Sequence, residues 1–192
     1  MIVTLNSSPF ALYLTEIDST CAETRREREE IAIARLVKEA FGDKAERIHS
    51  SSGAPVISIG GKITADKSVS ISHSRQHAVL AVAPSNTLIG VDIEEDREQL
   101  RRVAPRILSE EELAFYSSIP QGFLKAWTLK EALYKAARNV IGTELDFAKH
   151  IQLPLAGNDE AIVSHNNITI GLATTLNFIS DNELIACVYK KL

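Results

Sequence analysis

The 192-residue sequence predicts an α+β fold, on three observations. Strand-like and helical segments are mixed along the chain without the regular strand–helix–strand alternation of a doubly wound parallel sheet. Apolar residues recur with helical spacing in two long segments, within residues 20–41 and 121–138. Three runs of strand-forming residues close the sequence. Each half therefore holds strands and a helix, which indicates two subdomains with a boundary near residues 84–88.

The first half begins with two short strands, "MIVTL" and "ALYLTE", separated by a Pro-containing turn. A helix is predicted to start at "DST", where Thr20 and Glu23 match the S/T-x-x-E capping box. Its apolar residues recur at i, i+3, i+4, i+7 and i+8 from Ile33, and Gly42 is a natural end.

Residues 50–68 are rich in Ser, Gly and Lys and predict loops around one short strand. The segments "SVSISHS", "HAVLAVAP" and "LIGVDIE" follow, separated by gaps of turn length. We expect them to form an antiparallel meander.

The second half has a further capping-box pattern at Ser109 and Glu112, which opens a short helix ending near Pro120. A long helix is predicted over 121–138 and closed by Gly142. The segments "AIVSH", "ITIGLATTLNFI" and "ELIACVYK" then predict a final sheet.

Composition narrows the class of protein. A formal net charge of −4 gives no global reason to expect nucleic-acid binding. No apolar run is long enough to cross a bilayer, and the start of the sequence lacks the basic and apolar regions of a signal peptide. Cys21 and Cys187 have no metal-ligand spacing, so we expect both to be small apolar residues that fill space in the core. We expect a cytoplasmic protein without a membrane partner.

The segment "IGVDIEE" at residues 89–95 reads as a buried strand, yet it places two carboxylates on one face. Side chains alternate along a strand, so Ile89, Val91 and Ile93 share one face. Asp92 and Glu94 share the other, beside Gly90, which we expect to leave open space. Two like charges this close require positive charge between them.

The segment "WTLKEALYK" of the long helix offers that charge, because Glu131 and Lys135 lie one turn apart on one face. Taken alone, this spacing also fits a solvent-exposed ion pair. Together with the acidic strand, it predicts three oxygen ligands for a hard divalent cation, Mg²⁺ or its substitute Mn²⁺: Asp92, Glu94 and Glu131. Lys135 would then reach a phosphate on that ion, the arrangement of phosphoryl-type transfer.

These two segments resemble the signature of the 4′-phosphopantetheinyl transferases. The chain matches both motifs at every specified position, first at Ile89-Gly90-Val91-Asp92 and then at Trp127-Thr128, Lys130-Glu131-Ala132 and Lys135. Two independent motifs in the expected order make a specific signal.

The resemblance implies further contacts with coenzyme A. "SISHS" at 70–74 is similar to the family strand whose Ser-His-Ser holds the phosphates, which implies Ser72 and His73. "SGAPVI" at 52–57 looks like the family's Gly-Lys-Pro element, with Gly53 and Pro55 present and Ala54 in place of the lysine. Further expected contacts are Lys130 for the pyrophosphate and, for the 3′-phosphate, Arg25, Arg26 and Arg28.

The resemblance covers roughly residues 20–140, and the length favours the pseudo-dimeric type named for surfactin synthetase, with two similar α/β subdomains related by a pseudo-twofold axis. It implies a nucleotide-contacting subdomain over 1–87 and a subdomain over 88–192 with the magnesium-binding strand and catalytic helix. The implied enzyme is a holo-[acyl-carrier-protein] synthase, which transfers the phosphopantetheine arm of coenzyme A to a serine of an apo acyl or peptidyl carrier protein and releases 3′,5′-ADP. Glu131, Lys135 and Asp92 would be its catalytic residues.

Two alternatives stay open at this stage. One is a non-catalytic coenzyme A-binding relative of the same fold, although the intact Asp92, Glu94, Glu131 and Lys135 set argues against it. The other is a different magnesium-dependent phosphotransferase, but no Walker-type or kinase-type Gly-rich loop occurs in the sequence. We expect a monomer that acts on a carrier protein of fatty-acid or related biosynthesis. Arg101, Arg102 and Arg106 are either solvated charges or a patch that steers an acidic carrier.

Overall fold

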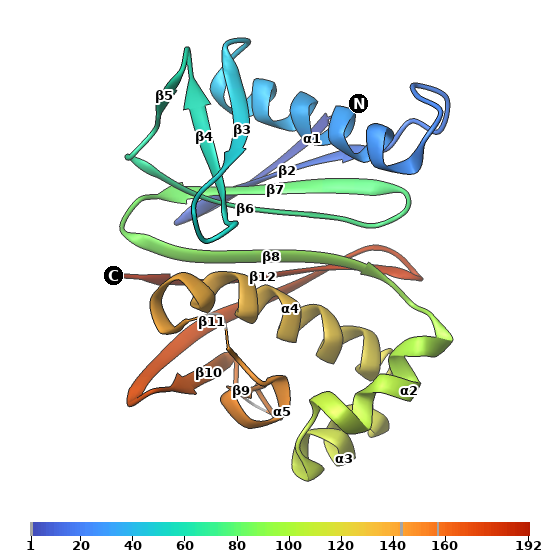
Figure 1. Ribbon diagram of the computed structural model, residues 1–192. Coiled ribbons are helices and arrows are strands. Elements are labelled where there is room, and N and C mark those ends of the chain that lie inside the picture. Colours follow the sequence, from blue (N-terminus) through green and yellow to red (C-terminus); the bar gives the residue numbers. More distant parts are fainter. Residues whose placement is uncertain (1, 143, 157) are drawn as a thin grey trace. The chain divides into compact units, whose positions relative to one another are not determined.

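The computed structural model describes residues 2–142, 144–156 and 158–192. The chain divides into two compact units, one ending at Ile89 and joined by Lys191 and Leu192, the other spanning Gly90–Lys190. Each unit combines at least one helix with antiparallel strands, which confirms the predicted α+β class (Figure 1). None of the described helices is long and apolar enough to cross a membrane.

The first unit contains two sheets and one helix. Four antiparallel strands are ordered β1-β2-β7-β6, and a smaller sheet is ordered β3-β4-β5. Met1, at the start of the first predicted strand, lies outside the described residues. The element bounds are β1 Ile2–Ser7, β2 Phe10–Glu16, α1 Arg25–Phe41, β3 Ala45–His49, β4 Pro55–Ile59, β5 Lys62–Ile63, β6 Lys67–His73 and β7 His77–Pro84.

Helix α1 starts one turn later than predicted. Thr24 is its N-cap and forms the capping box with Glu27, whereas Thr20 donates to Asp18 Oδ1 through both its backbone N–H (2.8 Å) and its hydroxyl (2.6 Å). The prediction at Thr20 and Glu23 was wrong because Asp18 ties Thr20 into a local turn. The predicted end is confirmed, since Gly42 caps the helix at φ +90°.

The core of this unit lies between α1 and the larger sheet. Ile33, Leu36 and Val37 of the helix pack with Ala78 and Leu80 of β7, and each of these side chains is at most 3% exposed. Apolar residues at helical spacing thus meet apolar residues at alternate positions of a strand, as their patterns predict.

Strand β8, Thr87–Glu95, belongs to a different sheet from β7. The predicted antiparallel meander is correct for β6 and β7 and wrong for the third strand. β7 lies between β2 and β6, so both of its hydrogen-bonding edges are occupied. The chain therefore passes through Ser85 and Asn86 into a five-stranded sheet with the order β8-β12-β11-β10-β9.

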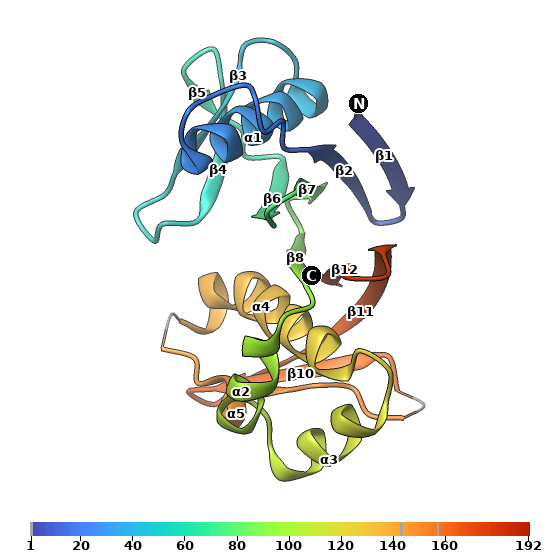
Figure 2. The same ribbon diagram turned by 90° about the vertical axis from the view of Figure 1, so that its right-hand side faces the viewer.

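In the second unit, helix α4 packs on strands β9, β10 and β11 and is flanked by α2 and α3 (Figure 2). The Ser109–Glu112 capping box is confirmed. Helix α2, which contains Pro105, was not predicted. The bounds are α2 Glu98–Ile107, α3 Glu110–Ser118, α4 Gly122–Ile141, α5 Phe147–His150, β9 Ile151–Gln152, β10 Glu160–His165, β11 Ile168–Ser180 and β12 Glu183–Lys191.

Gly90 is the point of closest approach between β8 and α4. A Cβ atom there would lie 1.9 Å from the carbonyl oxygen of Ala132 and 2.9 Å from the amide nitrogen of Ala136. The expectation that Gly90 leaves open space was wrong, because the helix backbone fills that space. Glycine is required at this position for the helix to reach the strand.

Candidate active site

Strand β8 places two carboxylates on the face that carries Gly90. Val91 and Ile93 are at most 2% exposed on the opposite face, as the alternation predicts. Asp92 is 6% exposed and Glu94 is half-buried. Two acidic groups are thus drawn into the interior of this unit, where charge is costly without compensation.

Lys135 of α4 supplies part of that compensation. Its ammonium donates to Asp92 Oδ1 at 2.7 Å and to the carbonyl oxygen of Val91 at 3.2 Å. The close approach at Gly90 brings the helix near enough for this pair to form. A charge-assisted hydrogen bond of this length orders both side chains.

The charge of Glu94 is partly balanced by two groups at the end of β8. It accepts hydrogen bonds from the Arg97 guanidinium at 2.7 Å and from the amide of Glu95 at 3.0 Å. Burial raises the pKa of Glu94 above its ordinary value, and the nearby Asp92 charge adds to that rise, while Arg97 and the Glu95 amide oppose it.

Glu131 of α4 lies beside this group and is half-buried. Burial raises the pKa of its carboxyl, the Asp92 and Glu94 charges raise it further, and Lys135 opposes the rise. Among the described residues, none donates a hydrogen bond to Glu131 or forms an ion pair with it. The site therefore holds a half-buried carboxylate that is only partly compensated, by the Lys135 charge, and is predisposed to take up a proton or a cation.

The suitability of this group for a metal ion depends on donor chemistry. Within the described ranges, no three Asp, Glu, His or Cys side chains are arranged to hold a metal. Asp92 and Glu94 instead face Lys135 and Arg97. Hard carboxylate oxygens with excess negative charge nevertheless fit Mg²⁺, which takes only one or two carboxylates and keeps several waters. The predicted ligands Asp92, Glu94 and Glu131 stay a prediction.

Lys130 does not join this site. It is fully buried, and its ammonium donates to both carboxylate oxygens of Glu112, at 2.9 and 3.1 Å, and to the carbonyl oxygens of Phe147 and Ile151. Burial lowers the pKa of Lys130, and the Glu112 carboxylate opposes that change. Because its donors are occupied inside the unit, the expected pyrophosphate contact of Lys130 is not supported.

Glu112 explains why Lys130 is held there. Its carboxylate also accepts from the backbone amides of Ser109 at 2.9 Å and Leu153 at 2.6 Å. One side chain thus joins the start of α3, the middle of α4 and the chain after β9. The sequence had identified Glu112 only as a helix cap, so its role as the partner of Lys130 was missed.

In the first unit, the structure connects two of the predicted coenzyme A contacts through Glu29. Arg25 donates to Glu29 Oε1 at 2.5 Å, and His73 Nδ1 lies 3.5 Å from the same oxygen. The side chain of His73 is 39% exposed. Glu29 was not predicted, although its position four residues after Arg25 is the helical spacing that would have identified it.

The remaining predicted contacts of the first unit are dispersed. Arg28 donates to the carbonyl oxygens of Ser19, Ala22 and Glu23 at 3.2–3.4 Å, so it closes the loop before α1. Arg26 is exposed, and Ser72 is buried in β6.

Gly53 and Pro55 belong to the turn between β3 and β4. Gly53 adopts φ +76°, with no atom within 4 Å of the position that a Cβ would take, and its amide donates to the carbonyl oxygen of Ser50 at 2.9 Å. Pro55 is the first residue of β4, where the absence of an amide proton is tolerated. Gly53 is exposed, whereas Ala54, at the position of the missing family lysine, is only 6% exposed and its backbone is hydrogen-bonded to Ser50.

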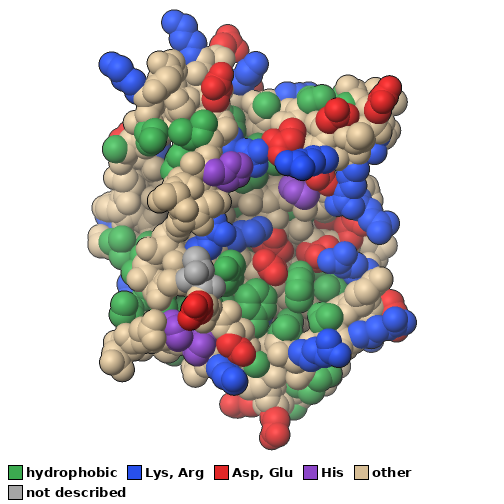
Figure 3. Space-filling model, in the orientation of Figure 1, with side chains coloured by type: hydrophobic (Ala, Val, Ile, Leu, Met, Phe, Trp, Pro, Cys, Tyr) green, Lys and Arg blue, Asp and Glu red, His purple; other side chains and the backbone are tan. Residues whose placement is uncertain are grey.

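On the face drawn in Figure 3, acidic and basic side chains are intermixed.

A family model for the 4′-phosphopantetheinyl transferase superfamily matches residues 88–186, just over half of the chain. The chain belongs to this superfamily. The matched range contains Asp92, Glu94, Glu131 and Lys135, and superfamily members are transferases that act on carrier proteins with coenzyme A as co-substrate. A comparison with curated proteins gives no match.

Proposed function

We propose that this superfamily member transfers the 4′-phosphopantetheine arm of coenzyme A to a serine hydroxyl of an apo acyl or peptidyl carrier protein. The observation that supports this most strongly is the half-buried Glu131 carboxylate, which has no hydrogen bond or ion pair with a described residue and lies beside the Asp92–Lys135 pair. A general base and a cation held within one unit are what a hydroxyl attack on a pyrophosphate requires.

In the proposed step, Glu131 accepts the proton of the carrier serine. The serine oxygen forms a bond to the β-phosphorus of coenzyme A, and the bond from that phosphorus to the bridging oxygen of the α-phosphate breaks. The leaving group is 3′,5′-ADP. Lys135 stabilises the charge that develops on the departing oxygen and donates a proton to it, while Asp92 orients the Lys135 ammonium through their 2.7 Å hydrogen bond.

Asp92, Glu94 and Glu131 are the residues that would hold a divalent cation. When bound, Mg²⁺ supplies positive charge to the pyrophosphate oxygens. Burial, and to a smaller extent the repulsion between neighbouring carboxylates, raises the pKa values of Glu94 and Glu131. This supports the proposal, because a bound cation would compensate both effects.

Residues of the first unit are proposed as coenzyme A contacts. They are Arg25, Arg26, Arg28, Gly53, Pro55, Ser72 and His73. The exposure of His73 and of the open turn at Gly53 supports two of these contacts. Lys130 is proposed instead as a positioning residue, because its bonds to Glu112 anchor the helix that carries Glu131.

We further propose the pseudo-dimeric type, acting as a monomer. Each unit, taken by itself, contains antiparallel strands covered by one long helix, α1 or α4, which supports a shared ancestral plan. The identity of the carrier and a cytoplasmic location stay predictions.

The test is the intact mass of an apo acyl carrier protein incubated with this protein, coenzyme A and Mg²⁺. We expect a mass gain of one phosphopantetheine arm, abolished by EDTA and by Glu131→Gln. Glu110→Gln, an exposed carboxylate of α3, is the matched control and should retain full activity. Coenzyme A binding without transfer to any of several carriers would favour the non-catalytic alternative, and absence of both would refute the proposal.

A further inference from the structure

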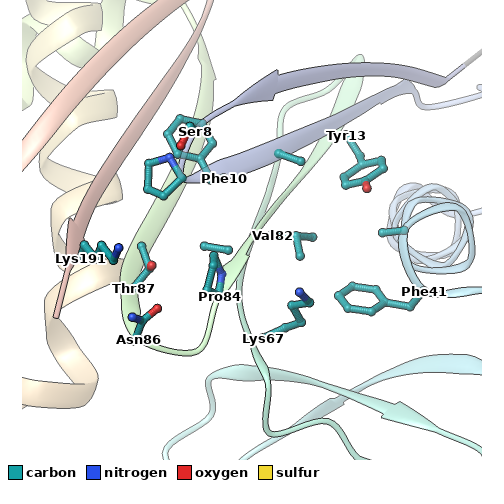
Figure 4. Close-up of a pocket in the computed structure, with 14 residues that line it drawn as sticks. Ser8, Phe10, Tyr13, Phe41, Lys67, Val82, Pro84, Asn86, Thr87 and Lys191 are labelled. Atoms are coloured by element: carbon teal, nitrogen blue, oxygen red, sulfur yellow. The ribbon is translucent and has the colours of Figure 1, made fainter.

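A cavity of about 820 Å³ lies in the first unit (Figure 4). It is formed by the turn between β1 and β2, the end of α1, the start of β6 and the turn from β7 into β8. Lys67 and His73 are the first and last residues of β6, so about 20 Å of strand separates the cavity rim from the histidine proposed to contact coenzyme A. The cavity is therefore separate from the proposed coenzyme A contact at His73.

The charged side chains described as lining this cavity are all positive. The residues described as lining it include Lys67 and Lys191 and no Asp or Glu. The Lys67 ammonium has only a 4.0 Å contact with the exposed Asp66, and Lys191 forms no ion pair with a described residue. Two largely uncompensated cations at a concave surface favour an anionic ligand.

Thr87 provides the second, independent observation. Its side chain is 1% exposed, and its hydroxyl oxygen has no hydrogen-bond partner among the described residues. A buried hydroxyl without a partner is unfavourable, because the hydrogen bonds that it made to water are not replaced. The amide of Leu192 donates to the carbonyl oxygen of Asn86 at 2.7 Å, which holds Lys191 close to Thr87, as Figure 4 also shows. A hydroxyl donor and an ammonium thus occur together at one end of the cavity.

The rest of the lining is apolar. Phe10, Tyr13, Phe41, Val82 and Pro84 contribute side chains to it. A volume of this size is within the usual range of roughly 300–1,000 Å³ for small-molecule sites, which combine apolar walls with a few polar groups. An inorganic anion alone would leave these walls unused.

We propose that this cavity binds an organic monoanion, a carboxylate joined to an aliphatic or aromatic body. Lys191 and the Thr87 hydroxyl bind the carboxylate, Lys67 adds positive charge at the rim, and the aromatic and aliphatic side chains contact the apolar body. This site is separate from the proposed transfer chemistry and does not require it.

The experiment titrates the full chain with octanoate and follows backbone amides by ¹H–¹⁵N NMR. Saturable shifts at the cavity residues are expected, with an affinity at least about tenfold weaker in the Lys67→Gln, Lys191→Gln double variant, as expected for the loss of ion pairing worth about 1.4 kcal/mol. Lys62→Gln removes an exposed lysine of β5 outside the cavity and should leave the affinity unchanged.

Thr87→Val provides a second readout that does not depend on the lysines. It should raise the melting temperature of the free protein, because a buried hydroxyl without a partner is removed, and it should weaken octanoate binding. Shifts confined to other parts of the chain, or equal losses in the Lys62→Gln control, would overturn the proposal. So would inorganic phosphate that saturates the same residues as tightly as octanoate, because the apolar walls would then contribute nothing.

Discussion

Replacing Gly90 by alanine should displace helix α4 and inactivate the candidate site. The new methyl group would meet the Ala132 carbonyl oxygen at 1.9 Å and the Ala136 amide nitrogen at 2.9 Å, two groups one helical turn apart. Glu131 and Lys135 directly precede these two residues in the sequence. The clash therefore lies beside both proposed catalytic side chains.

The magnitude follows from the rigidity of what the methyl group meets. Overpacking a core costs about 1–3 kcal/mol, and we expect the upper end because the obstacle is helix backbone. About 3 kcal/mol corresponds to a melting temperature lower by roughly 6–12 °C in a chain of this length. A shift of about 1 Å in Glu131 would also reduce the transfer rate about a hundredfold.

Thermal unfolding followed by circular dichroism measures the first effect, and the carrier-mass assay measures the second. Gly171→Ala is the matched control in the same unit, since the three atoms nearest to its Cβ all belong to the flexible side chain of Glu160, which can move away. A Gly90→Ala protein that melts within 2 °C of the Gly171→Ala protein and is fully active would refute the close approach of strand and helix.

Three further predictions follow from buried or exposed side chains. Lys130→Met should lower the free energy of unfolding by about 3–5 kcal/mol, because Glu112 is left charged and buried, and adding Glu112→Gln should restore part of that loss in denaturant titrations. Glu131→Gln should raise the melting temperature of the metal-free protein at pH 7, because burial makes the ionised carboxyl unfavourable in the folded state. Folding raises the pKa of Glu131, so ionisation of this carboxyl destabilises the folded state only at pH values above its ordinary pKa of 4.5. The increase in melting temperature of Glu131→Gln should therefore vanish at pH 4. An equal increase at pH 4 and pH 7 would contradict the raised pKa. A thiol-reactive disulfide reagent at pH 8 should label Cys21 alone in the native protein and both cysteines in denaturant. Cys21 is exposed, whereas Cys187 is buried and burial raises its pKa to about 12. Labelling of two thiols in the native protein would contradict the fold of β12.

The cysteines also show where composition misleads. We expected both to be apolar fillers, which holds for Cys187 and is wrong for Cys21. Periodicity was more reliable, because the apolar faces of α1 and α4 and their terminal glycines follow from local chemistry. The start of α1 could not be decided locally, since Thr20 and Thr24 both have a glutamate three residues later and only the contact with Asp18 distinguishes them.

Lys130 was predicted to contact the pyrophosphate, whereas the structure places its ammonium in a buried ion pair with Glu112. At 3.6 residues per turn, positions five apart point about 140° away from each other, so the helix directs Lys130 and Lys135 to different faces. Which of the two would turn inward depended on Glu112, 18 residues earlier in the chain, and on the backbone around β9. The departure of β8 from the sheet of β7 was likewise set by β2, which occupies the second edge of β7.

The position of β8 in its sheet has a consequence for biosynthesis. Its sheet neighbour is β12, so the strand that carries Asp92 and Glu94 pairs with a segment nearly a hundred residues later. During translation, β8 has no described partner strand of its own sheet until Glu183–Lys191 has been made. Pairing across so long a separation is slow. The acidic strand therefore remains open to other contacts while the rest of the chain is synthesised, and its two charges discourage pairing with a wrong strand.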